Sequence, residues 1–273
     1  MKNKTPTFRS LIEQLTRRHD TFKVFSAFTT LAACALAHGT REAEYLEEAK
    51  RWSRDELDIF CQAIASLIME MEAEPFTDLL GGHYMELAIS LKTRQRNGEF
   101  HSPQTICELI AKMLTGGSSL PEEGPITLCE PACGSGAMIL AYGHALSPED
   151  RCRLRVTAID ISKTACDMCF INTTLWGIPA EIIHGDALSP RMESMSSWKN
   201  IHWIFQGRLH LFAAFAAGQN QTSAPQIGND NETIMSLATE LVAAASKEQG
   251  QPPVPEKIDQ IKTALRQQMF DFA

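Results

Sequence analysis

The segment Leu128-Cys129-Glu130-Pro131-Ala132-Cys133-Gly134-Ser135-Gly136 decides the fold class of this chain. An aliphatic run, residues 126–128, leads into an acidic residue and a proline. A Gly-Ser-Gly turn then opens an apolar helix that we expect over residues 137–146. This order of strand, loop and helix is typical of nucleotide-cofactor sites, because glycines let the backbone approach a ligand and a helix N-terminus offers free N–H groups. A carboxylate at the strand end would repel a pyrophosphate, so Glu130 favours a cofactor with a cationic part.

Strands and helices alternate beyond this segment. The pattern predicts strands over residues 126–129, 154–159 and 181–184, with helices over 136–146 and 163–176 between them. Such alternation implies right-handed crossovers and a parallel sheet with helices on its faces. We therefore predict an α/β fold with a Rossmann-like parallel sheet, preceded by an α-helical N-terminal domain.

Acidic residues follow all three predicted strands. Glu130 follows the first, Asp160 ends the second about 24 residues beyond Gly136, and Asp186 follows the third. Asp160 is placed to accept hydrogen bonds from ribose hydroxyls, and Asp186 from an exocyclic amine. Because an open α/β sheet binds its ligands at the carboxyl ends of its strands, we predict a cofactor site there. S-adenosylmethionine fits a cationic cofactor, whereas NAD is the alternative.

The first hundred residues have helical spacing of apolar residues. Phe8, Leu11, Ile12 and Leu15 form one such face, and a second run begins at Ser53, which has capping-box spacing with Glu56. A later helix is expected to start at Ser102 and Pro103 and to carry five apolar residues: Ile106, Leu109, Ile110, Met113 and Leu114. The domain boundaries that we predict are 1–96 for a helical domain, 97–217 for the α/β domain and 218–273 for a linker and helical tail.

The motifs resemble those of the N6-adenine DNA methyltransferases of the type I restriction-modification modification subunit. The resemblance lies in Gly98-Glu99-Phe100-His101-Ser102-Pro103, in the loop from Glu130 to Gly136, and in the two later acids, and it covers roughly residues 50 to 190. It implies a class I S-adenosylmethionine-dependent fold. The rival nicotinamide fingerprint G-x-G-x-x-G lacks its third glycine, since Ile139 stands there.

Site residues follow from this resemblance. It implies that Phe100, Ser102 and Pro103 border the methionine end of the cofactor, and that Asp160 holds the ribose and Asp186 the adenine amine. The residues that would line the amino-acid part lie in the loop: Glu130, Pro131, Cys133, Gly134 and Gly136. A helix-entry contact is the structural alternative for Phe100 and Pro103.

The chain departs from the family at the catalytic motif. These enzymes carry [ND]-P-P-[YF] after a fourth strand, where the motif holds a flipped adenine, and no such tetrad occurs in the sequence. The nearest remnant is Asn200-Ile201-His202-Trp203, so Asn200 and Trp203 are candidate catalytic residues. The alternative is that Trp203 lies in the core of a fourth strand over residues 201–205 and Asn200 in the turn before it.

Composition limits the class of protein. The net charge is −8, which gives no support to a surface that binds nucleic acid as a whole. Lys92, Arg94 and Arg96 form one compact basic cluster, a candidate DNA contact whose alternative is a solvated helix end. The eight cysteines are scattered, which indicates reduced thiols and no metal site. We expect a soluble cytoplasmic protein without a membrane span.

Three functions remain open from the sequence. The first is an S-adenosylmethionine-binding methyltransferase that acts on adenine N6 in DNA. The second is a catalytically silent relative that binds DNA or a restriction-modification or regulatory partner, and the third is a nicotinamide-dependent oxidoreductase. The chain offers only about four strands, so we also expect an exposed sheet edge. A covering helix, or a protein partner or second copy of the chain, would protect that edge.

Overall fold

The computed structural model describes residues 6–88, 102–117, 120–189 and 195–205. All of them belong to one compact unit, Met1–Leu211. Several predictions lie outside the described residues: the site residue Phe100, the basic cluster Lys92, Arg94 and Arg96, the boundary between residues 96 and 97, and the linker and tail over 218–273. The domain boundaries therefore stay predictions.

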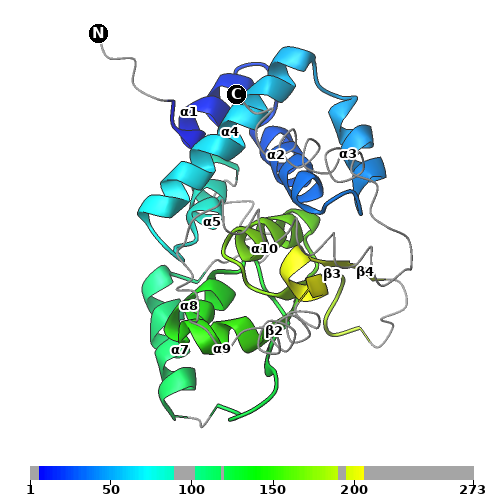
Figure 1. Cartoon of the computed structure of the whole chain (residues 1–273). Coiled ribbons are helices and arrows are strands. Elements are labelled where there is room, and N and C mark those ends of the chain that lie inside the picture. Colours follow the sequence, from blue (N-terminus) through cyan, green and yellow to red (C-terminus); the bar gives the residue numbers. More distant parts are fainter. Residues whose placement is uncertain (1–5, 89–101, 118–119, 190–194, 206–273) are drawn as a thin grey trace, which may run out of the picture. The chain divides into compact units, whose positions relative to one another are not determined.

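Helices build the amino-terminal part of the described chain (Figure 1). They are α1 (Phe8–Thr16), α2 (Thr21–Leu36), α3 (Glu42–Ala49), α4 (Arg54–Ala73), α5 (Leu79–His83) and the π-helix η1 (Tyr84–Ala88). Helix α4 begins with the predicted capping box, in which Ser53 and Glu56 exchange hydrogen bonds between side chain and backbone. A capping box satisfies N–H groups that have no partner within the helix, so it explains why α4 starts at this point.

An aromatic cluster holds these helices together. The rings of Phe8 and Phe28 lie 4.9 Å apart, and those of Phe8 and Phe25 lie 6.3 Å apart in an edge-to-face arrangement. All three side chains are buried. The predicted face of α1 is likewise buried, because Leu11, Ile12 and Leu15 turn inward with Phe8.

The α/β part follows the predicted order of elements. Its helices are α7 (Gln104–Gly117), α8 (Ala137–Ala145), α9 (Pro148–Arg153) and α10 (Lys163–Leu175), and its strands are β1 (Ile126–Glu130), β2 (Leu154–Asp160), β3 (Ala180–His184) and β4 (Ser196–Lys199). The sheet order is β1-β2-β3-β4, and β1, β2 and β3 run parallel. The predicted α/β fold is confirmed, with bounds within one residue for its first three strands.

The fourth strand differs from the prediction. It lies at residues 196–199 and runs antiparallel to β3, whereas residues 201–205 are helical. The Asn200 carboxamide oxygen accepts a hydrogen bond from the Trp203 N–H at 3.0 Å, as an N-cap residue does. This cap favours a helical turn over the strand that the apolar run predicts. Among the described strands, β1 and β4 are therefore the edges of the sheet.

Helix α10 joins the helical part to the sheet. It contacts β2 and β3 on one side and α2 on the other. Every residue from Thr164 to Thr174 is buried, so this helix is enclosed on all sides. A helix that is buried all round fits the centre of a protein. No helix in the described part of the chain is long and apolar enough to cross a membrane.

Helix α7 packs through its small side chains. Cys107 and Ala111 are buried, and α7 contacts α8. The five apolar residues that mark its predicted face are exposed instead, from 37% for Ile110 to 67% for Met113. No described element covers this face of α7.

Candidate cofactor site

The glycine loop between β1 and α8 has a backbone that needs glycine. Gly134 has φ +53° and Gly136 has φ +92°, a region that residues with a side chain rarely adopt. A Cβ on Gly136 would also lie 3.1 Å from the Cys169 sulfur. The two glycines therefore let the chain turn tightly onto the start of α8.

Asp160 holds this loop to the end of β2. Its Oδ2 accepts a hydrogen bond from the Gly134 N–H at 2.8 Å, and its Oδ1 accepts one from the Ser162 N–H at 2.8 Å. The Cys133 N–H donates to the Ile159 carbonyl at 2.9 Å, which joins the same two segments. Each carboxylate oxygen of Asp160 keeps a second lone pair, so the group can still accept hydrogen bonds from a ligand.

The other two acids lie at the same end of the sheet. Glu130 is the last residue of β1 and is half-buried, and its Oε1 accepts a hydrogen bond from the Ala132 N–H at 3.3 Å. Asp186 follows β3 by two residues and is exposed, and its Oδ1 accepts one from the Leu188 N–H at 2.9 Å. The sheet register pairs Asp160 with His184, so the carboxyl ends of β2 and β3 are level. The structure thus places the three predicted acids at the carboxyl end of the parallel strands.

Two exposed apolar side chains accompany these acids and were missed by sequence reasoning. Ile161 follows Asp160 and is 73% exposed, and Leu188 lies two residues after Asp186 and is 94% exposed. Large apolar side chains beside acids suit the flat face of an aromatic ring, which presents polar groups only at its rim. The signal was available in the sequence, because Ile161 and Leu188 stand one and two residues beyond acids that follow predicted strands.

Cys133 is a buried structural residue of the loop. The hydrogen bond with the Cys169 thiol and burial both raise the pKa of Cys133, so this thiol stays protonated at neutral pH. Burial also raises the pKa of Cys166, whose sulfur lies 3.4 Å from the Asp160 carbonyl. No group of three metal-binding side chains occurs in the part of the chain that the structure describes. Pro131, the remaining loop residue among the predicted ones, is exposed.

Ser135 is held from outside the loop and is almost fully buried. Its hydroxyl is hydrogen-bonded to the Asp78 carboxylate, which also accepts from the Gly81 N–H at 2.9 Å at the start of α5. Asn172 of α10 donates from one Nδ2 to the Ser135 carbonyl at 2.9 Å and to Asp78 Oδ1 at 2.9 Å. Sequence reasoning did not find Asp78 or Asn172, because neither is near the loop along the chain.

Ser102 and Pro103 lie just before α7 and are both exposed. The Pro103 carbonyl accepts the Cys107 N–H at 3.1 Å, so the pair starts the helix as predicted. Burial raises the pKa of the Cys107 thiol, and the negative charges of Asp78 and Glu130 raise it further.

Asn200 and Trp203 lie at the other end of the sheet. Asn200 is fully buried, its Oδ1 accepts from the Ala180 N–H at 3.1 Å, and its Nδ2 donates to the Ile178 carbonyl at 2.8 Å. Trp203 lies under Arg155, whose guanidinium is 5.2 Å from the ring centre. Ala180 begins β3, and four residue steps, roughly 13 Å, separate it from the carboxyl end of that strand. The side chains of Asn200 and Trp203 thus have structural contacts far from the acids, which does not support their predicted catalytic role.

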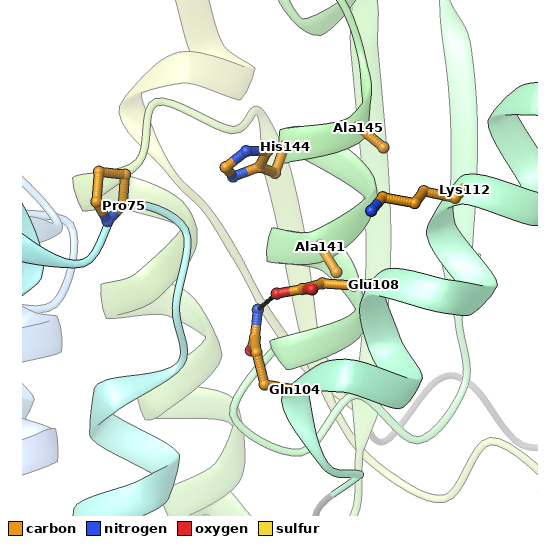
Figure 2. Close-up of a pocket in the computed structure, with 7 residues that line it drawn as sticks. All are labelled: Pro75, Gln104, Glu108, Lys112, Ala141, His144 and Ala145. Carbon is orange, nitrogen blue, oxygen red and sulfur yellow. Dashed lines mark hydrogen bonds between the residues drawn. The ribbon is translucent and has the colours of Figure 1, made fainter.

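A pocket of about 170 Å³ lies between α7 and α8 (Figure 2). Its lining includes Gln104, Glu108 and Lys112 of α7 with Ala141 and His144 of α8. None of the three strand-end acids and no residue of the glycine loop lines it, so this pocket is separate from the candidate cofactor site.

Part of the chain resembles a known family of proteins. Comparison with curated proteins finds no match. Among solved structures, the chain is similar to a candidate class I S-adenosylmethionine-dependent methyltransferase from Listeria monocytogenes, with 14% identity and a TM-score of 0.40 over 73% of this chain and 68% of that one. A family model described as N-6 DNA methylase matches residues 76–205, which contain the glycine loop and all three acids. Residues 76–205 of this chain thus match the N-6 DNA methylase family.

Proposed function

We propose that the chain binds S-adenosylmethionine at the carboxyl ends of β1, β2 and β3 and serves methyl transfer to N6 of adenine in DNA. The observation that carries the proposal is the meeting of Glu130, Asp160 and Asp186 around a glycine loop with two positive-φ residues. The family match over residues 76–205 supports the choice of DNA adenine as the methyl acceptor.

The chemistry of the residues fits this cofactor. Glu130 is half-buried and offers a negative charge to the cationic amino-acid part. Asp160 keeps lone pairs for ribose hydroxyls, and Asp186 is exposed and able to accept from the adenine amine. Ile161 and Leu188 provide apolar surface for the adenine ring. Helix α8 has no side-chain cap at Gly136, so N–H groups of its first turn are available to a ligand.

The bound cofactor would supply an electrophilic methyl group on a sulfonium. The residues of this chain would bind and orient it, since a methyl group moves in line only when donor and acceptor are held in contact geometry. An adenine in duplex DNA must leave the base stack to reach such a site.

A second candidate function is a cofactor-binding relative that is catalytically silent on its own. Two observations favour it. The sequence contains no [ND]-P-P-[YF] tetrad, and the nearest remnant, Asn200, is buried near the amino end of β3. In this case a partner protein would supply the groups that hold the adenine.

Calorimetry tests the cofactor assignment. S-adenosylmethionine is expected to bind the wild-type protein, whereas NAD is not. Glu130→Lys should abolish the binding because it places a positive charge beside the cationic part of the cofactor. Glu123→Lys makes the same charge change at an exposed position before β1 and serves as the matched control. Binding of NAD alone, or an unchanged affinity in Glu130→Lys, would contradict the assignment.

A transfer assay separates the two candidates. Labelled S-adenosylmethionine is incubated with adenine-containing DNA and wild-type protein, and N6-methyladenine is measured. Product formation by the isolated chain supports the enzyme. A protein that binds the cofactor and yields no product supports the silent relative.

A further inference from the structure

Two residues outside the glycine loop form hydrogen bonds to it. Asp78 belongs to the entry of α5, and Asn172 lies on α10, 37 residues beyond Ser135. Both bond to Ser135, the residue between the two positive-φ glycines, and Asn172 also bonds to Asp78. The hydroxyl and the carbonyl of one residue are therefore held at the same time.

Gly81 shows how closely α5 approaches the loop. A Cβ on Gly81 would overlap both the Asp78 carboxylate and the Ser135 hydroxyl. Only glycine lets the backbone of α5 come near enough for its N–H to donate to Asp78 while Asp78 accepts from Ser135. The bonds among these residues thus depend on one another, as in a closed hydrogen-bond network.

The hydrogen bonds to Ser135 bear on ligand binding because ordering a glycine turn costs conformational entropy. Gly134 and Gly136 have φ of +53° and +92°, and glycine can adopt many other conformations as well. Without other contacts, the loop would therefore sample conformations that differ from this turn. A loop that samples them binds a ligand more weakly by the fraction of time that it spends in the competent form. Hydrogen bonds from two rigid helices reduce that sampling without touching the ligand.

We propose that Asp78 and Asn172 are positioning residues that hold the Gly134-Ser135-Gly136 turn in its cofactor-binding conformation. The inference rests on the proposed function and extends the site to the helical amino-terminal part of the chain. Asp78 connects the start of α5 to the loop through Ser135. A change in the packing of α5 would therefore shift the loop and alter cofactor affinity.

The test compares cofactor affinity with stability in matched variants. Asn172→Ala removes the bonds to Ser135 and Asp78. Asp167→Asn is the control, because Asp167 lies on the same helix, is equally buried and bonds to α2 and to residues near α3 but not to the loop. Calorimetry gives the Kd for S-adenosylmethionine, and urea unfolding gives the stability.

Asn172→Ala is expected to weaken S-adenosylmethionine binding by about ten-fold or more, whereas Asp167→Asn leaves the Kd within about two-fold although it lowers stability. Asp78→Asn should retain more affinity than Asp78→Ala, because the amide still offers an acceptor to the Gly81 N–H. Ser135→Ala deletes one hydroxyl and replaces Asn172→Ala if that variant fails to fold, with an expected loss of about three-fold or more.

The outcomes are distinguishable. If wild type binds S-adenosylmethionine and Asn172→Ala, or Ser135→Ala in its place, binds as well as Asp167→Asn, the positioning role is wrong and the proposed function stands. If wild type does not bind it, the proposed function fails, and the positioning role fails with it.

Discussion

Replacement of Asp167 by alanine should destabilise the protein by about 3 kcal/mol. Asp167 is fully buried and accepts from Arg41 Nη2 at 2.8 Å, from Lys163 Nζ at 2.6 Å and from Thr30 Oγ1 at 3.0 Å. Removing one partner of a buried ion pair costs about 3–5 kcal/mol. The low end applies, because Glu44 still accepts from Arg41 at 2.9 Å and from Lys163 at 2.7 Å.

Urea unfolding followed by circular dichroism measures the loss. A thermal scan should show a midpoint about 6–12 °C lower for the same variant, given the entropy of unfolding of a unit of this size. Arg9→Ala is the control, since Arg9 pairs with Glu13 and Glu86 in exposed positions, and its midpoint should not change. A double variant, Arg41→Met with Asp167→Leu, should recover most of the loss, because an apolar pair can replace a buried ion pair.

A result would refute this reasoning in either of two ways. A midpoint for Asp167→Ala that matches Arg9→Ala would mean that water reaches the network. A double variant as unstable as Asp167→Ala would mean that the attraction between the charges stabilises the fold. The loss in Asp167→Ala would then not come from leaving Arg41 without this partner.

Two further predictions concern the loop and the acid range. Gly136→Ala should lower the free energy of unfolding by about 1–2 kcal/mol, because Gly136 has a positive φ, and it should weaken cofactor binding. Gly82→Ala is the control and should not destabilise the protein, because a Cβ at Gly82 has nothing within 4 Å. Equal urea midpoints for the two variants would contradict this prediction. Burial tends to raise the pKa of Glu44, but hydrogen bonds from Arg41 and Lys163 outweigh it and lower the pKa to about 2. A lowered pKa stabilises the fold above the unfolded value of about 4.5 and loses that contribution as pH falls toward 2. The stability difference between wild type and Glu44→Gln should therefore shrink in urea titrations between pH 4.5 and pH 2, and a constant difference would show that the carboxylate charge is not involved.

Much of the α/β part could be predicted because its signals are local. The alternation of apolar runs with glycine turns depends on neighbours in the chain, so β1, β2 and β3 agree with the structure within one residue. The capping box of Ser53 and Glu56 also depends on residues three positions apart and is present.

The fourth strand could not be predicted in the same way. Residues 201–205 have the composition of a strand, but the Asn200 carboxamide oxygen caps a helical turn by accepting from the Trp203 N–H. The same oxygen accepts from the Ala180 N–H of β3, which holds Asn200 against the sheet. The bond to Ala180 joins residues that are 20 positions apart, and no pattern within residues 200–205 announces it.

The sequence by itself determined the loop from Glu130 to Gly136 and the acids that follow three strands, because each of these features is a run of adjacent residues at a strand end. Only the tertiary structure decided how that loop is held. Asp78, Ser135 and Asn172 meet through contacts between residues 57 and 94 positions apart, and helix packing alone sets such distances. The tertiary structure also decided that Asn200 lies at the opposite end of the sheet from the acids. The direction of the strands, and not the order along the chain, determines which residues lie at the same end of a sheet.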